Sequence, residues 1–145
     1  MCYLCKPTDD NFSKENQMEY YFSKIINSSY EEAIKRVTEA LKSEGFGIVS
    51  EIKMHEKFKE KLGIDFRRYT ILGACNPSFA FKALEIEDKI GTMLPCNVIV
   101  QELLPDKIEI AIVDPIASMM AIENSELGSL ASEVQTKLKD VIKLL

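Results

Sequence analysis

The sequence predicts an α+β domain with a mostly antiparallel sheet, and three observations lead to this fold class. The chain has 145 residues, which suits a single domain. Its segments follow the order β-α-β-β-α-β-β-α, and several of the strands are joined without long crossovers. Residues 94–103 and 107–114 are strongly apolar and are joined by a tight turn at Pro105-Asp106, as in a hairpin. We therefore expect one sheet, helices packed on it and a long C-terminal helix.

The first half of the chain predicts two strands with a helix between them. Residues 18–27 and 46–54 are the strands, and the first of them is rich in aromatic and β-branched residues. The helix begins with a capping box made by Ser29 and Glu32, and its apolar residues recur at helical spacing. We expect Gly45 to end it, because glycine tolerates the left-handed backbone that commonly closes a helix.

The second half begins with less regular patterns. Residues 55–64 are polar with few apolar residues, which indicates a short helix or a loop, and 67–75 form a third strand. The segment 77–90 is predicted as a helix with Asn76 as its N-cap and Gly91 as its stop. The chain closes with a helix whose apolar stripe is Leu130, Ala131, Val134, Leu138, Val141, Ile142 and Leu145.

The hairpin allows a prediction of register. If Leu104 pairs with Lys107, then Asn97 faces Asp114 across the two strands. Apolar residues then occupy both faces of the hairpin, so both faces should be covered. The long helices cover one face, and the middle helix or a second subunit must cover the other. The two apolar sets are Ile99, Leu103, Ile108, Ile110 and Ile112 on one face and Val98, Val100, Ala111 and Val113 on the other.

Composition excludes some classes of function. The net charge of -5 and the pI of about 5.0 argue against nucleic acid as a partner. No apolar run approaches the roughly 20 residues that span a membrane, and the first residues lack the apolar core of a signal peptide. We therefore expect a cytoplasmic protein with reduced cysteines.

Residues 1–17 differ from the rest and are predicted as a polar extension ahead of a domain that spans 18–145. They contain Cys2 and Cys5 in C-x-x-C spacing, which can hold a metal or form a redox dithiol. The second ligand pair of a zinc ribbon and the strand-to-helix setting of a thioredoxin motif do not accompany this pair. We interpret it as incidental or locally structural.

The dipeptide Cys-Asn occurs twice, as Cys75-Asn76 at the end of one strand and as Cys96-Asn97 at the start of the next. If these strands were parallel, the intervening helix would hold the two cysteines about 20 Å apart. If they are antiparallel, both dipeptides meet at one edge of the sheet. The hairpin brings Asp114 to the same edge. We predict a site there for a small ligand or a soft metal.

Sulfur ligands point to particular metals. Two thiols could bind Cu(I) or Zn(II), and a methionine thioether, from Met93, Met119 or Met120, would favour Cu(I). Of the three methionines, Met119 is the one we assign to the site with Cys75 and Cys96. Zinc as a catalytic ion usually takes histidine or carboxylate ligands. Because His55 is the one histidine in the sequence, a catalytic zinc is poorly supported. The alternative is a thiol-dependent redox enzyme, since Cys75 would sit at the positive end of a helix. In the plainest interpretation, both cysteines are small hydrophobic residues of the core.

A third alternative is a dimeric interaction module without small-molecule chemistry. Separately, seven aromatic residues occur near the sheet and the middle helix. They could line a small-ligand pocket, or they could form the core and a dimer interface, and the second interpretation is favoured. They are Tyr20, Tyr21, Phe22, Phe66, Tyr69, Phe79 and Phe81.

The segments "YTILGACNPSFAFKAL", "IGTMLPCNVIV" and "VDPIASMM" resemble the signature of the family called domain of unknown function 302, over about residues 18 to 145. The resemblance implies an α+β domain of the TATA-box-binding-protein-like class, often a homodimer, with no established activity. It supports the antiparallel arrangement, and it does not extend to Cys2 and Cys5. The matching positions are Gly73, Cys75, Asn76, Pro77, Leu94, Pro95, Cys96, Asn97, Asp114 and Pro115.

Overall fold

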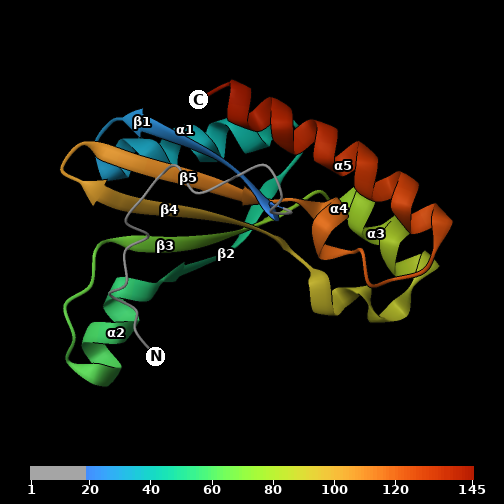
Figure 1. Ribbon diagram of the computed structural model, residues 1–145, viewed down its shortest axis with the longest axis horizontal. Helices are drawn as coiled ribbons and strands as arrows, with labels where there is room; N and C mark the ends of the chain where they lie inside the picture. The colour runs from blue at the N-terminus through green and yellow to red at the C-terminus, as the bar shows by residue number, and fades with distance from the viewer. Residues whose placement is uncertain (1–18) are drawn as a thin grey trace.

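The computed structural model describes residues 19–145 and confirms an α+β fold with one antiparallel sheet (Figure 1). The sheet has five strands in the order β1-β5-β4-β3-β2, and every neighbouring pair is antiparallel. The elements are β1 (Tyr21–Asn27), α1 (Tyr30–Ser43), β2 (Gly47–Lys53), α2 (Met54–Leu62), β3 (Tyr69–Cys75), α3 (Pro77–Ile86), the 3₁₀ helix η1 (Asp88–Met93), β4 (Cys96–Leu104), β5 (Lys107–Val113), α4 (Pro115–Ser118) and α5 (Ser125–Lys143).

Helices α1 and α5 cover one face of the sheet (Figure 1). The α1 helix begins as the sequence predicts, because the Ser29 hydroxyl accepts a hydrogen bond from the Glu32 N–H at 3.2 Å. Gly45 follows its last turn with a positive φ of 87°. The opposite face of the sheet carries no helix in the part of the chain that the structure describes, and α2 projects beside it (Figure 1).

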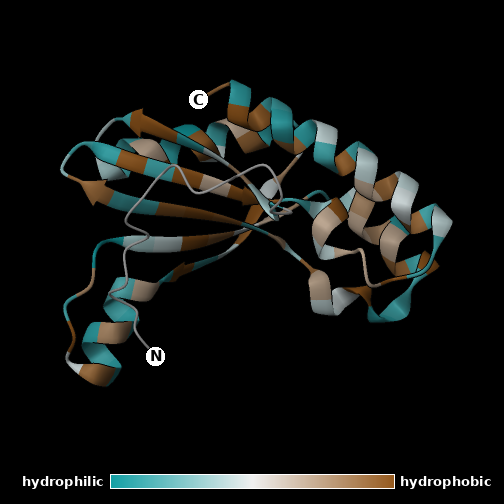
Figure 2. Ribbon diagram, viewed as in Figure 1, coloured by the Kyte–Doolittle hydropathy of each residue, from teal (hydrophilic) through white to brown (hydrophobic). Residues whose placement is uncertain are grey.

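The core lies between the sheet and these two helices. Alternate residues along each strand point into it. In Figure 2 the strands carry alternating hydrophobic and hydrophilic bands, which is the pattern of a sheet with two different faces. The fully buried strand residues point to α1 and α5; they are Thr70, Leu72, Ala74, Val98, Val100, Ile108, Ile110 and Ile112. A smaller second cluster lies beyond the end of the sheet, around Ala83, Ile90 and Leu127.

The predicted register of the β4–β5 hairpin is correct at the turn and wrong beyond it. Leu104 pairs with Lys107, but an irregularity between Glu102 and Leu104 shifts the register, so Val98 lies opposite Ile112. An extra residue in one strand moves every following side chain by one position. The expected pairing of Asn97 with Asp114 is therefore wrong. So are the two predicted faces, because Val98 and Ile112 share the covered face.

Two local features differ from the sequence prediction. The middle helix ends at Ile86 rather than near Gly91, because Glu87 is extended and its carboxylate accepts the Lys89 N–H to start η1. The segment after β5 forms a short helix, α4, with Asp114 as its N-cap and Pro115 as its first residue.

No helix within residues 19–145 is long and apolar enough to cross a membrane.

Candidate functional site

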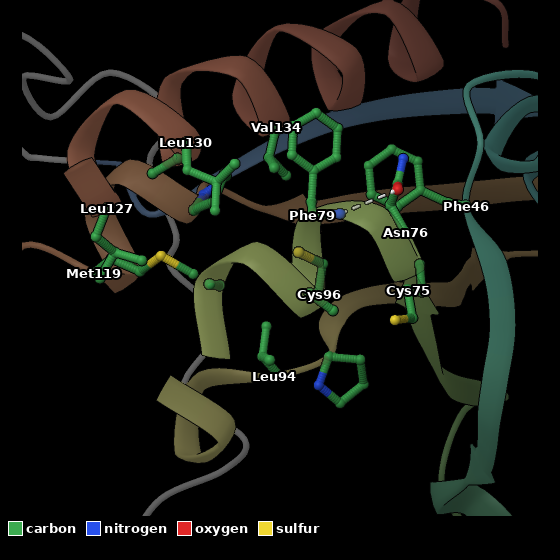
Figure 3. Close-up of a pocket in the computed structure, with 16 residues that line it drawn as sticks. Phe46, Cys75, Asn76, Phe79, Leu94, Cys96, Met119, Leu127, Leu130 and Val134 are labelled. Atoms are coloured by element: carbon green, nitrogen blue, oxygen red, sulfur yellow. Dashed lines mark hydrogen bonds between the residues drawn. The ribbon is translucent and has the colours of Figure 1, made fainter. Parts of the chain in front are cut away.

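A small cavity lies where the end of β3 and the start of β4 meet α3, α4 and α5 (Figure 3). We call it the sulfur cavity, because Cys75, Cys96 and Met119 all line it. Its volume is about 40 Å³, which holds two or three water molecules but no organic ligand of ordinary size. The other lining residues are Phe46, Ala74, Asn76, Phe79, Ala80, Ala83, Leu94, Pro95, Pro115, Leu127, Leu130, Ala131 and Val134.

Cys96 is the buried thiol of this cavity, with 8% of its surface exposed. Burial, and to a smaller extent the neighbouring Cys75, raises the pKa of the Cys96 thiol from 9.0 to about 11. The apolar surroundings disfavour a thiolate, so Cys96 is protonated at neutral pH. A nucleophilic or redox-active cysteine needs the opposite shift in pKa.

Cys75 lies diagonally across the strand pair from Cys96, since Cys96 pairs with Ala74. Successive residues of a strand point to opposite sides, so Cys75 and Cys96 leave the sheet in different directions. Figure 3 shows the sulfur of Cys75 directed toward Cys96, while the sulfur of Cys96 points away from it, to the side of the cavity where Met119 lies. Both cysteines are free thiols.

Asn76 also lines the cavity, but its side-chain oxygen already accepts a hydrogen bond from the backbone. Its Oδ1 accepts a hydrogen bond from the Phe79 N–H at 3.5 Å, which caps α3 as the sequence predicts. Its amide nitrogen lies 3.0 Å from where a Cβ would stand on Gly45. Asn76 thus caps α3 and lies close to Gly45, which follows α1.

Met119 enters the cavity from the end of α4, where it is the C-cap residue. Figure 3 shows its side chain extending inward from the α5 side of the cavity, near Leu127. The structure thus places Met119 around the same cavity as Cys75 and Cys96. Three soft sulfur atoms come from three segments, the end of β3, the start of β4 and α4.

Asn97 does not reach this cavity. It is exposed on the uncovered face of the sheet, where it borders a hollow of about 420 Å³. Its neighbours around the hollow include Tyr20, Tyr21, Tyr69 and Glu109. The structure therefore separates Asn97 from Cys96, because the two residues are adjacent in a strand and point to opposite faces.

Asp114 is occupied by structural contacts. One oxygen of its carboxylate accepts the Ile116 N–H at 2.9 Å, which caps α4. The amide of Gln135 in α5 donates to both carboxylate oxygens, at 3.1 and 3.2 Å. Asp114 thus connects α4 to α5 through hydrogen bonds. It does not line the sulfur cavity, whereas its neighbour Pro115 does.

Two residues that the sequence marks only as matching positions shape the opposite side of β3. A Cβ placed on Gly73 would lie 2.2 Å from the Ser50 hydroxyl oxygen and 2.7 Å from the ring of Pro95. Glycine is therefore required for Pro95 to lie against β3. The apolar wall of the cavity includes Phe46, Leu127 and Leu130, which were not predicted as part of a site. It also includes Phe79, one of the aromatic residues for which a ligand pocket was considered.

Histidine and carboxylate side chains do not form a metal site in the described residues. Across residues 19–145, no group of three or more histidine, cysteine, aspartate or glutamate side chains is placed to hold a metal ion. The donors around the cavity are the thiols and the thioether. The pair Cys2 and Cys5 lies outside the described residues.

The comparisons with known proteins agree with this architecture. No curated protein matches the chain. A crystal structure of an uncharacterized conserved protein DUF302 from Bacillus stearothermophilus is similar, with a TM-score of 0.80 and 26% sequence identity over 88% of this chain and 98% of that one. The family model described as domain of unknown function DUF302 matches residues 22–145. The chain therefore belongs to the DUF302 family.

Proposed function

We propose that this protein binds one Cu(I) ion in the sulfur cavity. The observation that supports this best is that three sulfur atoms border an apolar cavity of about 40 Å³, with Cys96 and Met119 on facing sides. Thiolate and thioether ligands select Cu(I) among the metals that proteins use. We assign Cys96 and Met119 as the ligands and Cys75 as a third sulfur at the half-exposed side.

Charge balance favours Cu(I) over Zn(II) in this site. When Cu⁺ replaces the proton of the Cys96 thiol, a Cu–S bond forms, the S–H bond breaks and H⁺ leaves to solvent. The resulting thiolate–Cu(I) pair is neutral, which suits an apolar cavity. Zn²⁺ in a structural site has four ligands, almost always tetrahedral. Among the side chains of residues 19–145 that border the cavity, the donors are three sulfurs and the amide of Asn76, whose oxygen already caps α3.

The other functions considered for these cysteines fit less well. An organic ligand needs a pocket of several hundred Å³, about ten times the volume of this cavity. A redox thiol needs a lowered pKa, and the pKa of Cys96 is raised to about 11. A Cys75–Cys96 disulfide would require the Cys96 sulfur to turn back toward Cys75 (Figure 3).

The experiment is an anaerobic titration with Cu(I) in competition with a coloured Cu(I) chelator. It uses the full chain with Cys2→Ser and Cys5→Ser, so that the N-terminal pair cannot supply the binding. We expect one Cu(I) per chain. We also expect release of a proton for each thiol that becomes a ligand, so the affinity should rise with pH.

Substitutions test the assignment of ligands. Cys96→Ser should lower the affinity for Cu(I) by at least tenfold and Met119→Leu by several fold. Met93→Leu is the matched control, because Met93 is 40% exposed on η1 and does not line the cavity. Circular dichroism must show that each variant is folded. If the Cys2→Ser/Cys5→Ser protein binds no Cu(I), or if Met93→Leu weakens binding as much as Met119→Leu, the proposal is wrong.

A further inference from the structure

A hollow of about 420 Å³ lies on the face of the sheet opposite α1 and α5, which we call the open face (Figure 1). Ala111 of β5 and Ile99 of β4 lie opposite each other and form its floor. Ala111 has the smallest side chain of the lining, and the residues two positions away on the same face, Glu109 and Val113, are larger. The volume is in the range of pockets that hold small molecules.

Three tyrosines line this hollow from two sides, and we call it the tyrosine hollow. Tyr20 lies just before β1 and Tyr21 at its start, and their ring centroids are 5.0 Å apart with an angle of 70° between the ring planes. Tyr69 comes from β3, three strands across the sheet from β1. The face of a tyrosine ring attracts a cation electrostatically. Aromatic walls on two sides of the hollow therefore favour a cationic ligand.

Glu109 supplies a negative charge to the tyrosine hollow. Its side chain is half-buried in the lining, and Gln101 Nε2 donates to its Oε1 at 2.7 Å, which orients the carboxylate. Across residues 19–145, no lysine, arginine or histidine forms an ion pair with Glu109. A half-buried carboxylate without a cationic partner favours a positive charge on whatever occupies the space beside it.

The groups on the two sides of the hollow influence one another. Burial is the main cause that raises the pKa of Tyr69, and the positive charge of Arg67 acts against it. Tyr20 and Glu109 raise this pKa further, because their negative charges disfavour a second negative charge on the Tyr69 oxygen. A single small molecule in the hollow therefore lies within reach of both tyrosines and of Glu109.

Arg67 lies beside the hollow without lining it, and its guanidinium has other partners. Its Nε donates to Gln101 Oε1 at 2.8 Å. The guanidinium carbon lies 4.4 Å from the centroid of the Phe66 ring and 5.8 Å from that of Tyr69. Arg67, Gln101 and Glu109 thus form a chain of hydrogen bonds that holds the carboxylate in place at the edge of the hollow.

We infer that the tyrosine hollow binds a small organic cation, an ammonium that carries alkyl groups. The alkyl groups pack on Ala111, Ile99 and the tyrosine rings, and the positive nitrogen lies near Glu109. The hollow shares no lining residue with the sulfur cavity, so the proposal does not rest on copper binding. A depression within a face can hold a small molecule in a monomer or between two copies, so the proposal does not depend on the oligomeric state.

The test titrates the full chain with choline chloride at constant ionic strength, followed by calorimetry and by tyrosine fluorescence. The sequence has five tyrosines and no tryptophan, so the emission comes from tyrosines alone. We expect one choline per chain. Dimethylbutanol, in which carbon replaces the charged nitrogen of choline, should bind at least tenfold more weakly. Equal binding of the two molecules would overturn the proposal, and so would a wild-type protein that does not bind choline at millimolar concentration.

Substitutions test the assignment of residues. Glu109→Gln and Tyr69→Leu should each lower the affinity for choline at least fivefold, because each removes an attraction for the positive nitrogen. Tyr69→Phe keeps an aromatic ring and should retain the affinity within about twofold. Glu39→Gln is the matched control, because Glu39 is an exposed residue of α1 on the other side of the sheet and its loss changes the net charge equally.

Circular dichroism checks that each variant is folded. Tyr20→Leu keeps the test decisive if a strand variant does not fold, because Tyr20 lies before β1 and is 67% exposed. It should weaken the binding of choline several fold. If Glu39→Gln weakens binding as much as Glu109→Gln, or if Tyr20→Leu and Tyr69→Leu both leave the affinity unchanged, choline does not bind in the tyrosine hollow and the proposal is wrong.

Discussion

Cys96 lies directly opposite Ala74 in the antiparallel pair of β3 and β4, one position away from Cys75. This relationship brings the two cysteines of the repeated Cys-Asn dipeptides to one end of the sheet. It also directs their side chains differently, because neighbouring residues in a strand alternate. The two dipeptides are therefore neighbours without being equivalent, and only Cys75, Asn76 and Cys96 reach the sulfur cavity.

The raised pKa of Cys96 predicts how stability changes at high pH. The folded protein holds the thiol proton up to a pKa of about 11, whereas the unfolded chain loses it near 9.0. The free energy of unfolding should therefore fall between about pH 9 and pH 11, by roughly 2–3 kcal/mol from this group alone. Below pH 9 the contribution is fully present.

Urea unfolding at several pH values checks this. The wild-type protein is compared with Cys96→Ala, so that tyrosines and lysines, which also titrate in this range, cancel. The difference in unfolding free energy between the two should shrink as the pH rises through 9 to 11. A difference that does not depend on pH would show that Cys96 has no raised pKa in the folded protein.

The close approach of Gly73 to Ser50 and Pro95 predicts a steric effect. Gly73→Ala places a methyl group within 2.2 Å of the Ser50 hydroxyl oxygen and 2.7 Å of the Pro95 ring. We expect a loss of about 1–3 kcal/mol, as for other over-packed positions. Thermal denaturation should show a lower Tm. Gly47→Ala is the control, since a Cβ at Gly47 meets nothing within 4 Å. Equal Tm values for the two variants would contradict this prediction.

The contacts of Asp114 predict a structural role. Asp114→Ala removes the cap of α4 and the two bonds from Gln135, so it should lower stability by about 1–3 kcal/mol. Asp114→Asn keeps an oxygen that can accept the Ile116 N–H and should lose less. Chemical denaturation measures both variants. Cu(I) affinity should change little in folded Asp114→Asn; a tenfold loss there would place Asp114 in the site.

A buried hydrogen bond between the hydroxyl groups of Tyr30 and Thr70 links α1 to β3. Tyr30→Phe leaves the fully buried Thr70 hydroxyl without this partner and should cost about 1–3 kcal/mol. Adding Thr70→Val removes the second polar group. The double variant should then be at least as stable as Tyr30→Phe alone, because no unpaired hydroxyl remains. A double-mutant cycle of urea denaturation curves tests this, and additive losses would argue against coupling between the two residues.

Local sequence patterns were enough to predict most of the elements and one part of the site. The Ser29 cap, the Asn76-Pro77 helix start and the C-terminal apolar stripe depend on residues close in the chain, so their prediction did not need the fold. The resemblance supported the antiparallel arrangement of β3 and β4, and with it the meeting of Cys75 and Cys96. Asp114 followed by Pro115 is the pattern of a helix start and could have predicted α4, but Asp114 was predicted only as a residue of the site.

The sequence by itself determined which segments are strands and helices and which sulfur atoms could meet. The tertiary structure decided the rest, because it depends on positions distant in the chain. The irregularity near Leu103 reversed the faces of the β4–β5 hairpin, which no periodic pattern reports. In the folded chain Asn97 lies on the open face, and the Asp114 carboxylate accepts hydrogen bonds from Gln135. Met119 lines the same cavity as the two cysteines because α4 packs on α5. Side-chain direction follows register, and register is set by the whole sheet.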